Sequence, residues 1–223
     1  MFFKRKEKKP IIITIHGFGK QLHHEFDPLA TYLKARHYTV IQFDIYDIKN
    51  ENDADYKKWI QRCESKIEEV LAQKREIVLI GFSMGGVIAS YLASIFKIKK
   101  LILVAPAFQY LDIQKITQQG IKTIKKIGSK EKSIPSSKQT KAFTDIVAQY
   151  KESITMVDCP VLILHGTNDE VIPMDSSKAA YKKIHSPKRL IWIEGGKHRM
   201  LYDGKLEQTC FCILLQMIED NLF

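Results

Sequence analysis

The feature that most constrains this chain is an uninterrupted apolar run that ends in glycines bracketing one serine. The run Ile77–Ile80 is followed by Gly81-Phe82-Ser83-Met84-Gly85-Gly86. Gly81 and Gly85 stand two places on either side of Ser83, which matches G-x-S-x-G, the pattern of a strained turn that exposes a serine between a strand and a helix. The pattern therefore predicts a buried strand, a sharp turn at Ser83 and a helix whose first amide, that of Met84, can donate to an oxyanion.

The same short pattern also occurs in ordinary glycine-rich turns, so its neighbours decide between the two interpretations. Four apolar residues without a polar interruption precede the turn, as a strand buried in a parallel sheet requires. A helix is expected over Val87–Phe96. Small residues on its first turns, Gly85, Gly86 and Ala89, would let it lie close to a sheet.

Strand-like and helix-like segments alternate along the rest of the chain. Besides the central run, strands are expected at Ile11–Ile15, Tyr38–Phe43, Leu101–Val104, Val161–Leu164 and Leu190–Ile193. Helices are expected over Phe26–Arg36, Ala54–Gln73, Ser176–Ile184 and Leu206–Leu222. Strands that alternate with helices predict an α/β fold with a mainly parallel sheet of about six strands, covered by helices on both faces.

Residues 107–156 interrupt this alternation. Apolar residues recur there at helical steps, first at Ile113, Ile116, Ile124 and Ile127 and then at Phe143, Ile146, Val147 and Tyr150. The break between the two groups is Ile134-Pro135-Ser136-Ser137. A helical lid explains an insertion of this length better than a structureless loop does. We therefore expect a core of residues 1–106 and 157–223 with a small helical cap at 107–156.

The net charge of +10 is concentrated in two segments. Residues 1–9 carry five basic residues and one acid, and residues 107–153 carry nine lysines and four acids, so the rest of the chain is almost neutral. The excess is nearly all lysine, and no recognised nucleic-acid motif accompanies it. A solvated lysine-rich surface is therefore favoured over nucleic-acid binding, with attraction of anionic substrates or of a membrane surface as the alternative.

The longest apolar runs are shorter than a membrane span, so we expect no stable membrane insertion. The charged N-terminal residues are not followed by an apolar h-region, which is unlike a secretory signal and favours a cytoplasmic location. The four cysteines, Cys63, Cys159, Cys210 and Cys212, form neither a C-x-x-C pair nor a His/Cys ligand series. We therefore expect reduced thiols, with no metal site and no disulfide framework.

The first predicted strand, Ile11–Ile15, runs directly into His16-Gly17-Phe18-Gly19. Because the carboxyl ends of parallel strands meet at one edge of a sheet, the amide of Phe18 can face the same crevice as the amide of Met84. These two amides are the candidate oxyanion donors. We expect His16 to structure this loop rather than to act as a base, because it sits immediately at the strand end and precedes the serine.

Two more strands end in polar residues that can complete the site. Val161–Leu164 runs into His165-Gly166-Thr167-Asn168-Asp169-Glu170-Val171-Ile172-Pro173, and Leu190–Ile193 runs into Glu194-Gly195-Gly196-Lys197-His198. Asp169 can orient an imidazole, with Glu170 and Asp175 as rivals by spacing, and His198 is the candidate base. Taken alone, Asp169 could instead be a turn aspartate that caps its own backbone, and His198 could instead be an exposed loop histidine.

A serine, an aspartate and a histidine in this order, each after a separate core strand, is the chain order of one triad-bearing fold. With the quoted motifs, the sequence resembles the α/β-hydrolase family, and within it the small carboxylesterases and monoacylglycerol-lipase-like hydrolases. The resemblance implies a serine hydrolase that cleaves carboxylic esters through an acyl-enzyme, without a metal or organic cofactor. We expect substrates with short to medium acyl chains. It also implies Ser83 as nucleophile, Asp169 as acid, His198 as base, and the amides of Phe18 and Met84 as the oxyanion hole.

Several alternatives stay open at this point. The same triad can run thioesterase, lactonase or acyl-transfer chemistry, and a non-catalytic binding protein of this fold is a further class. Only ten residues precede the first core strand, so we expect a trimmed, six-stranded sheet. The cap, which would select the small-molecule ester, is the least informative part of the sequence, and nothing in the sequence indicates an oligomeric state.

Overall fold

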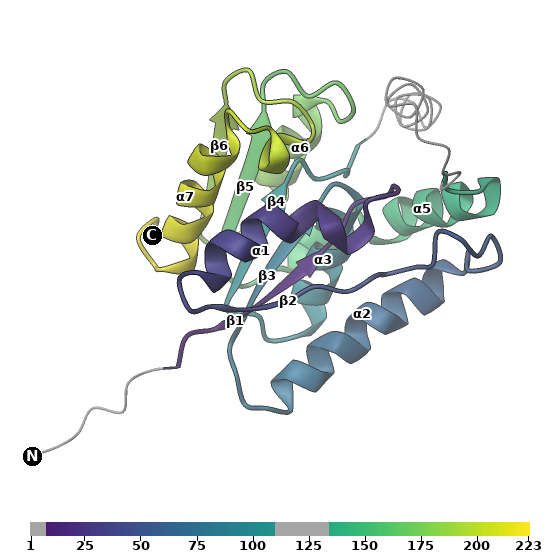
Figure 1. The fold of residues 1–223 in the computed structure, drawn as a ribbon, viewed down its shortest axis with the longest axis horizontal. Helices are drawn as coiled ribbons and strands as arrows, with labels where there is room; N and C mark the ends of the chain where they lie inside the picture. The colour runs from purple at the N-terminus through teal and green to yellow at the C-terminus, as the bar shows by residue number, and fades with distance from the viewer. Residues whose placement is uncertain (1–7, 110–133) are drawn as a thin grey trace, which may run out of the picture.

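The structure, a computed structural model, describes residues 8–109 and 134–223. In these residues six strands form one sheet in the order β2-β1-β3-β4-β5-β6 (Figure 1), and every adjacent pair is parallel. The strands are β1 (Ile11–Ile15), β2 (Thr39–Ile41), β3 (Ile77–Phe82), β4 (Lys100–Val104), β5 (Val161–Gly166) and β6 (Lys188–Ile193). The predicted fold class and the six-stranded parallel sheet are confirmed.

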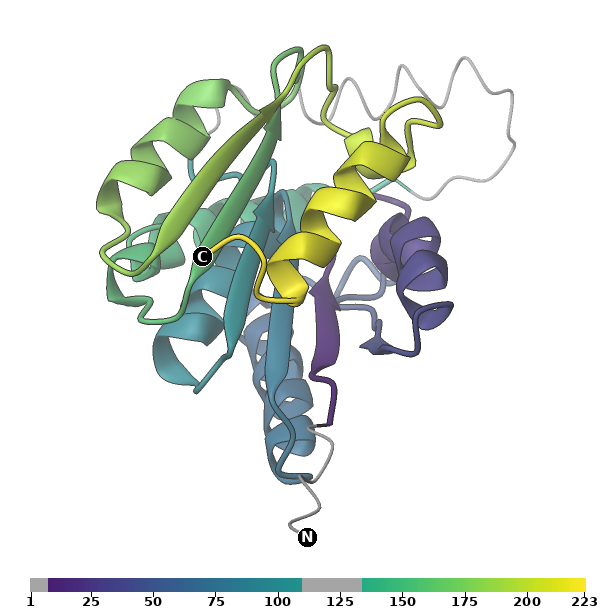
Figure 2. The same cartoon turned by 90° about the vertical axis from the view of Figure 1, so that its left-hand side faces the viewer.

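Helices cover both faces of the sheet. On one face lie α1 (Asp27–Lys34) and α7 (Glu207–Ile218), as Figure 2 shows. The other face carries α2 (Tyr56–Leu71), α3 (Met84–Ile95), α5 (Ser137–Tyr150) and α6 (Met174–Lys183). Short 3-10 helices lie in the connections: η1 (Leu22–Phe26), η2 (Ser153–Met156) and η3 (Met200–Tyr202).

Successive side chains of the central strands enter two different cores. Ile77 and Leu79 pack with the α2 and α3 side, whereas Val78 and Ile80 pack with the α1 and α7 side. All four are fully buried. Side chains alternate across a strand, and both faces of this sheet are covered, so every position of the strand has to be apolar. This is the physical reason for the uninterrupted run before Ser83.

The end of α7 differs from the predicted end at Leu222. The helix ends at Ile218, where buried Lys100 at the start of β4 donates from Nζ to the carbonyls of Met217 (2.6 Å) and Ile218 (2.9 Å). These carbonyls have no partner within the helix, so the lysine ammonium satisfies them and complements the negative end of the helix dipole. Asp220, with a φ of 64°, then turns the chain and pairs with Lys100.

The described second half of the predicted cap forms α5. Ser136 and Gln139 make a reciprocal capping box at its start, in which Ser136 Oγ accepts from the Gln139 amide and Gln139 Oε1 accepts from the Ser136 amide. Phe143 and Ile146 are buried in the same cluster as residues of α2 and α3. The predicted first cap helix, with Ile113, Ile116, Ile124 and Ile127, lies outside the described residues. The division into core and cap therefore stays a prediction.

The structure also bears on the membrane, metal and thiol expectations. No helix in residues 8–109 and 134–223 has both the length and the apolar character to cross a bilayer. Within these residues no three side chains of His, Cys, Asp or Glu are grouped so that they could hold a metal ion. The cysteines Cys63, Cys159, Cys210 and Cys212 are all free thiols. The cytoplasmic location stays a prediction.

The helix α3 begins at Met84, three residues before its predicted start at Val87. Both glycines after Ser83 lie within the helix, and their lack of a side chain lets the helix pack closely against the sheet. A Cβ built on Gly85 would lie 2.0 Å from the Ile15 carbonyl oxygen, and one on Gly86 would lie 2.8 Å from Pro106 Cβ. No side chain fits at these distances without a backbone shift.

We therefore expect Gly85→Ala to lower the free energy of unfolding by about 3 kcal/mol or more, although alanine favours a helix by about 1 kcal/mol. The control is Gly204→Ala, because a Cβ at Gly204 meets nothing within 4 Å and should change the stability by less than about 0.5 kcal/mol. Urea denaturation of both variants measures the difference. Equal stabilities would contradict the close packing of α3 on β1.

Candidate active site

Ser83 occupies the turn between β3 and α3 in a strained backbone conformation. Its φ is 53° and its ψ is −119°, a region that serine rarely adopts. Hydrogen bonds fix both sides of the residue: its amide donates to the Val104 carbonyl (3.0 Å), and its carbonyl accepts from the amides of Gly86 (3.0 Å) and Ala107 (3.1 Å). The predicted sharp turn is thus present, and β4 and the segment after it hold it in place.

The loops that follow β5 and β6 are pressed together at the same edge of the sheet. A Cβ on Gly166 would lie 2.0 Å from the Gly196 carbonyl oxygen. Main-chain hydrogen bonds join the two loops, from the Thr167 amide to the Ile193 carbonyl and from the Asn168 amide to the Gly196 carbonyl, both 2.9 Å. This close approach carries Asp169 on one loop towards His198 on the other.

The three predicted side chains meet in one hydrogen-bonded line. His198 Nδ1 lies 2.8 Å from Asp169 Oδ2, and His198 Nε2 lies 3.2 Å from Ser83 Oγ. With a proton on Nδ1 donated to the carboxylate, Nε2 accepts from the serine hydroxyl. Only 8% of Ser83 and 6% of His198 is exposed, and the Phe82 ring packs 4.8 Å from the His198 ring. The imidazole is therefore held between an acceptor and a hydroxyl in a largely dry position.

Asp169 is held as an anion by four donors. Its Oδ1 accepts from the amides of Val171 and Ile172, both at 2.8 Å, and its Oδ2 accepts from His198 and lies 3.2 Å from His165 Nε2. Burial raises the pKa of Asp169, but hydrogen bonds from His165 and His198 outweigh burial and hold the pKa well below its usual range. The carboxylate is consequently charged at neutral pH and can stabilise a protonated His198.

His165 is a member of this network that the sequence patterns did not single out. It is fully buried, its Nδ1 accepts from Ser177 Oγ (2.6 Å), and its Nε2 donates to the Ile172 carbonyl (3.1 Å) as well as to Asp169. It therefore connects α6 to the loop that carries Asp169. The available signal was its place beside Gly166 at the end of a strand, but nothing in the sequence shows which acid it contacts.

The rival acids do not reach the His198 ring. Glu170 accepts from the main-chain amide of His198 at 3.3 Å, and Asp175 pairs with Lys178 at 3.1 Å in the first turn of α6. His16 makes no hydrogen bond to Ser83, Asp169 or His198 in the described residues either. It is fully buried, accepts from the Ile45 amide (2.9 Å) and donates to the Gly17 carbonyl (2.7 Å), which is the loop-structuring role expected for it.

The amides of Phe18 and Met84 have no hydrogen-bond acceptor among the described residues. Met84 is the first residue of α3, where amides have no partner within the helix. On either side of Phe18 the amides are occupied, because Gly17 donates to Glu25 Oε2 (2.8 Å) and Gly19 donates to the Tyr46 hydroxyl (3.0 Å). Glu25 and Tyr46 had no sequence signal, since each reaches the loop only through the tertiary fold.

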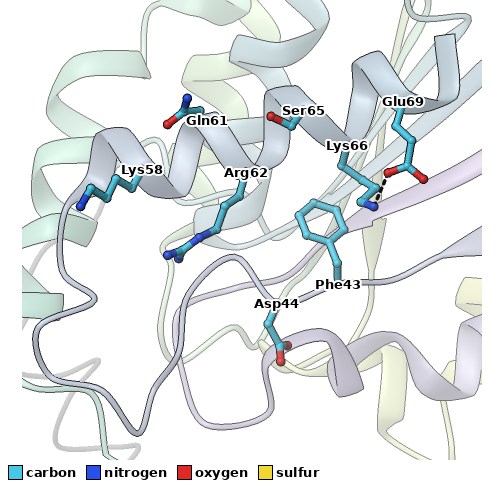
Figure 3. Close-up of a pocket in the computed structure, with 8 residues that line it drawn as sticks. All are labelled: Phe43, Asp44, Lys58, Gln61, Arg62, Ser65, Lys66 and Glu69. Atoms are coloured by element: carbon cyan, nitrogen blue, oxygen red, sulfur yellow. Dashed lines mark hydrogen bonds and ion pairs between the residues drawn. The ribbon is translucent and has the colours of Figure 1, made fainter. Parts of the chain in front are cut away.

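A separate open groove runs along α2 (Figure 3), and Ser83, Asp169 and His198 are not among its lining residues. Its walls are Phe43, Asp44, Lys58, Gln61, Arg62, Ser65, Lys66 and Glu69. Arg62 pairs with Asp53 at 2.7 Å and Lys66 pairs with Glu69, so much of its positive charge is already compensated. The groove gives no indication of reaction chemistry.

The parallel sheet, the strained serine turn and the acid and histidine loops define the α/β-hydrolase fold, as the resemblance implied. The chain belongs to the "Uncharacterised protein family (UPF0227)", whose model matches residues 11–203. Most of both cores and all of the candidate site lie within that match.

Solved structures and curated relatives agree with the α/β-hydrolase fold. One chain from a solved structure described as "LipS and LipT, two metagenome-derived lipolytic enzymes" gives a TM-score of 0.79 at 16% identity, with 96% of this chain and 95% of that chain covered. A soluble variant of Saccharomyces cerevisiae monoglyceride lipase gives 0.77 at 22% identity, with 98% and 88% covered. Human alpha/beta hydrolase domain-containing protein 17B is 35% identical over 81 residues, which is 34% of this chain and 26% of the relative. The chain spans less than half the length of the curated relatives it matches.

Burial lowers the pKa of His16 to about 4, so this histidine should make the stability depend on pH. Below its unfolded pKa of about 6.5 the unfolded chain binds a proton that the folded chain does not, so stability is complete above that pH and falls as the pH drops towards 4. Between pH 7.5 and pH 5 we expect His16 to account for a loss of about 2 kcal/mol.

Urea denaturation at the two pH values measures this loss. In His16→Gln the loss should be smaller by that amount, whereas in the exposed control His185→Gln it should match the wild type. A loss in His16→Gln as large as that of the wild type would contradict a neutral, buried His16.

Proposed function

We propose that this protein is a serine hydrolase that cleaves carboxylic esters through an acyl-enzyme intermediate. The observation that carries the proposal is the line from Asp169 through His198 to Ser83, with contacts of 2.8 and 3.2 Å. In addition, the amides of Phe18 and Met84 have no acceptor among the described residues and are available as donors. The lipolytic and lipase names of the structural neighbours support an ester substrate for this chain.

In the acylation step Ser83 Oγ would attack the ester carbonyl carbon while His198 Nε2 takes the hydroxyl proton. The carbonyl oxygen becomes an oxyanion that the Phe18 and Met84 amides stabilise. Asp169, which stays ionised, stabilises the imidazolium that forms. When the tetrahedral intermediate collapses, the bond to the alcohol oxygen breaks, and His198 returns the proton to the departing alcohol.

Water then repeats the sequence on the acyl-enzyme. His198 takes a proton from the water as the water oxygen attacks the acyl carbon, and the same two amides stabilise the second oxyanion. The bond to Ser83 Oγ breaks, the serine regains a proton from His198, and a carboxylic acid leaves. The chain's own residues supply every proton transfer in this cycle.

Short to medium acyl chains are the proposed substrates, and a cytoplasmic location is proposed with them. Thioesterase, lactonase and acyl-transfer chemistry would use the same side chains, so the identity of the acceptor and leaving group is what a substrate panel has to decide. No observation in the described residues favours a non-catalytic binding role over the hydrolase.

Ser83→Ala should abolish ester hydrolysis, since it removes the attacking oxygen without adding bulk. We expect kcat/KM to fall by at least about 1000-fold. The measurement is a panel of nitrophenyl esters from short to long acyl chains with purified wild type and variant, alongside circular dichroism to verify folding. Hydrolysis that persists in a folded Ser83→Ala protein would refute the nucleophile assignment, and equal rates for all chain lengths would contradict the proposed chain-length preference.

Asp169→Asn should lower kcat by about 100-fold to 10,000-fold, because an amide in place of the carboxylate no longer fixes the Nδ1 proton or stabilises the imidazolium. Asp175→Asn is the matched control, because among the described residues this carboxylate forms its ion pair with exposed Lys178. It should keep the wild-type rate. The acid assignment fails if the two variants lose activity equally, or if Asp175→Asn alone does.

A further inference from the structure

We propose that Tyr46 and Glu25 are positioning residues, which hold the amide of Phe18 where an oxyanion forms. The inference rests on the proposed ester hydrolysis and extends it to two side chains that do not touch the reacting atoms. Both reach the loop that follows β1 from elsewhere in the fold. Each binds a residue adjacent to Phe18.

The hydroxyl of Tyr46 makes two hydrogen bonds to the backbone of Gly19, one as acceptor and one as donor. The oxygen accepts from the Gly19 amide at 3.0 Å, and the hydroxyl donates to the Gly19 carbonyl at 3.1 Å. Tyr46 is only 1% exposed, and its ring stacks on Trp59 with centroids 4.3 Å apart and an interplanar angle of 17°. Burial raises the pKa of Tyr46, so the hydroxyl stays protonated and keeps both hydrogen bonds at any physiological pH.

Glu25 holds the other side of Phe18. Its Oε2 accepts from the Gly17 amide at 2.8 Å, and the residue is 3% exposed. The charged and titratable groups that interact with it include Arg199, His198, Tyr202 and Tyr46. A Cβ on Gly19 would lie 3.7 Å from a guanidinium nitrogen of Arg199, so this arginine borders the same loop.

The side chain of Phe18 is fixed as well. Its ring stacks on Phe143 of α5 at 5.2 Å with an interplanar angle of 9°, and it also packs against Tyr46 at 5.8 Å. Three consecutive residues are thus each held by a different contact, and among their amides that of Phe18 alone has no acceptor in the described residues.

This arrangement matters for rate more than for substrate binding. A donor that is already in place when the oxyanion forms stabilises the transition state without a reorganisation cost. A displacement of about 1 Å can lower a rate by about 100-fold. Losing a contact beside the Phe18 amide should therefore lower kcat and leave KM largely unchanged, because the oxyanion is absent from the bound substrate.

Tyr46→Phe removes the hydroxyl and keeps the ring that stacks on Trp59. We expect kcat to fall at least about tenfold, with KM within about twofold of the wild type. A trifluoromethyl ketone, which forms an oxyanion on a serine, should bind more weakly by the same factor as the loss in kcat/KM.

The matched control is Tyr38→Phe, which removes another buried tyrosine hydroxyl. Tyr38 is 6% exposed and donates to Glu219 at 3.1 Å, away from the triad. It should retain the wild-type kcat and the wild-type affinity for the ketone. Thermal denaturation of both variants separates a loss of stability from a loss of positioning.

Two substitutions at Glu25 test its hydrogen bond to the Gly17 amide. They also test the positioning role if Tyr46→Phe does not fold. Glu25→Met removes the acceptor for the Gly17 amide and should lower kcat at least about tenfold. Glu25→Gln keeps an acceptor oxygen on a chain of equal length and should restore most of that loss. Equal kcat values for the two variants would contradict a positioning role for the hydrogen bond.

The outcomes distinguish this inference from the proposed function. If the wild type hydrolyses esters but Tyr46→Phe keeps the kcat and ketone affinity of Tyr38→Phe, the positioning role is wrong and the hydrolase proposal stands. A wild-type protein that hydrolyses no ester and binds no trifluoromethyl ketone would overturn the proposed function, and the positioning role with it.

Discussion

The backbone conformation of Ser83 is the constraint on which the rest of the site depends. A serine at a φ of 53° is strained, and it persists because the carbonyl of Val104 and the amides of Gly86 and Ala107 fix both sides of the residue. The turn also needs β3 and α3 in close contact, since a Cβ on Gly81 would lie 2.4 Å from the Gly85 carbonyl oxygen. Strain and close packing together place the hydroxyl at the carboxyl edge of the sheet.

The parallel topology brings the remaining groups to that edge. The loops after β5 and β6 carry Asp169 and His198, and the loop after β1 carries the Phe18 amide. Hydrogen bonds anchor each loop to its neighbours and so hold each part of the site in place. Such an arrangement is suited to stabilising charge that develops during a reaction, because its dipoles are in place beforehand.

Sequence patterns predicted the strands, the fold class and the three residues that meet, because apolar runs mark buried strands and motif residues follow strand ends. They did not reveal His165, Glu25 or Tyr46. Glu25 and Tyr46 contact residues that are distant in the sequence. His165 contacts Asp169, an acid that only the geometry of the loop identifies as its partner. Helix ends differ from the predicted ends where tertiary contacts determine them. At the end of α7, for example, Lys100 donates to the last two carbonyls of the helix.

Covalent labelling tests the central claim most directly. The purified protein would be treated with a fluorophosphonate and digested, and the modified peptide identified by mass spectrometry. An activated Ser83 predicts one phosphonyl adduct on the peptide that contains Gly81-Phe82-Ser83-Met84-Gly85, formed in the native protein and absent after denaturation. No adduct, or an adduct on a different serine, would contradict the account.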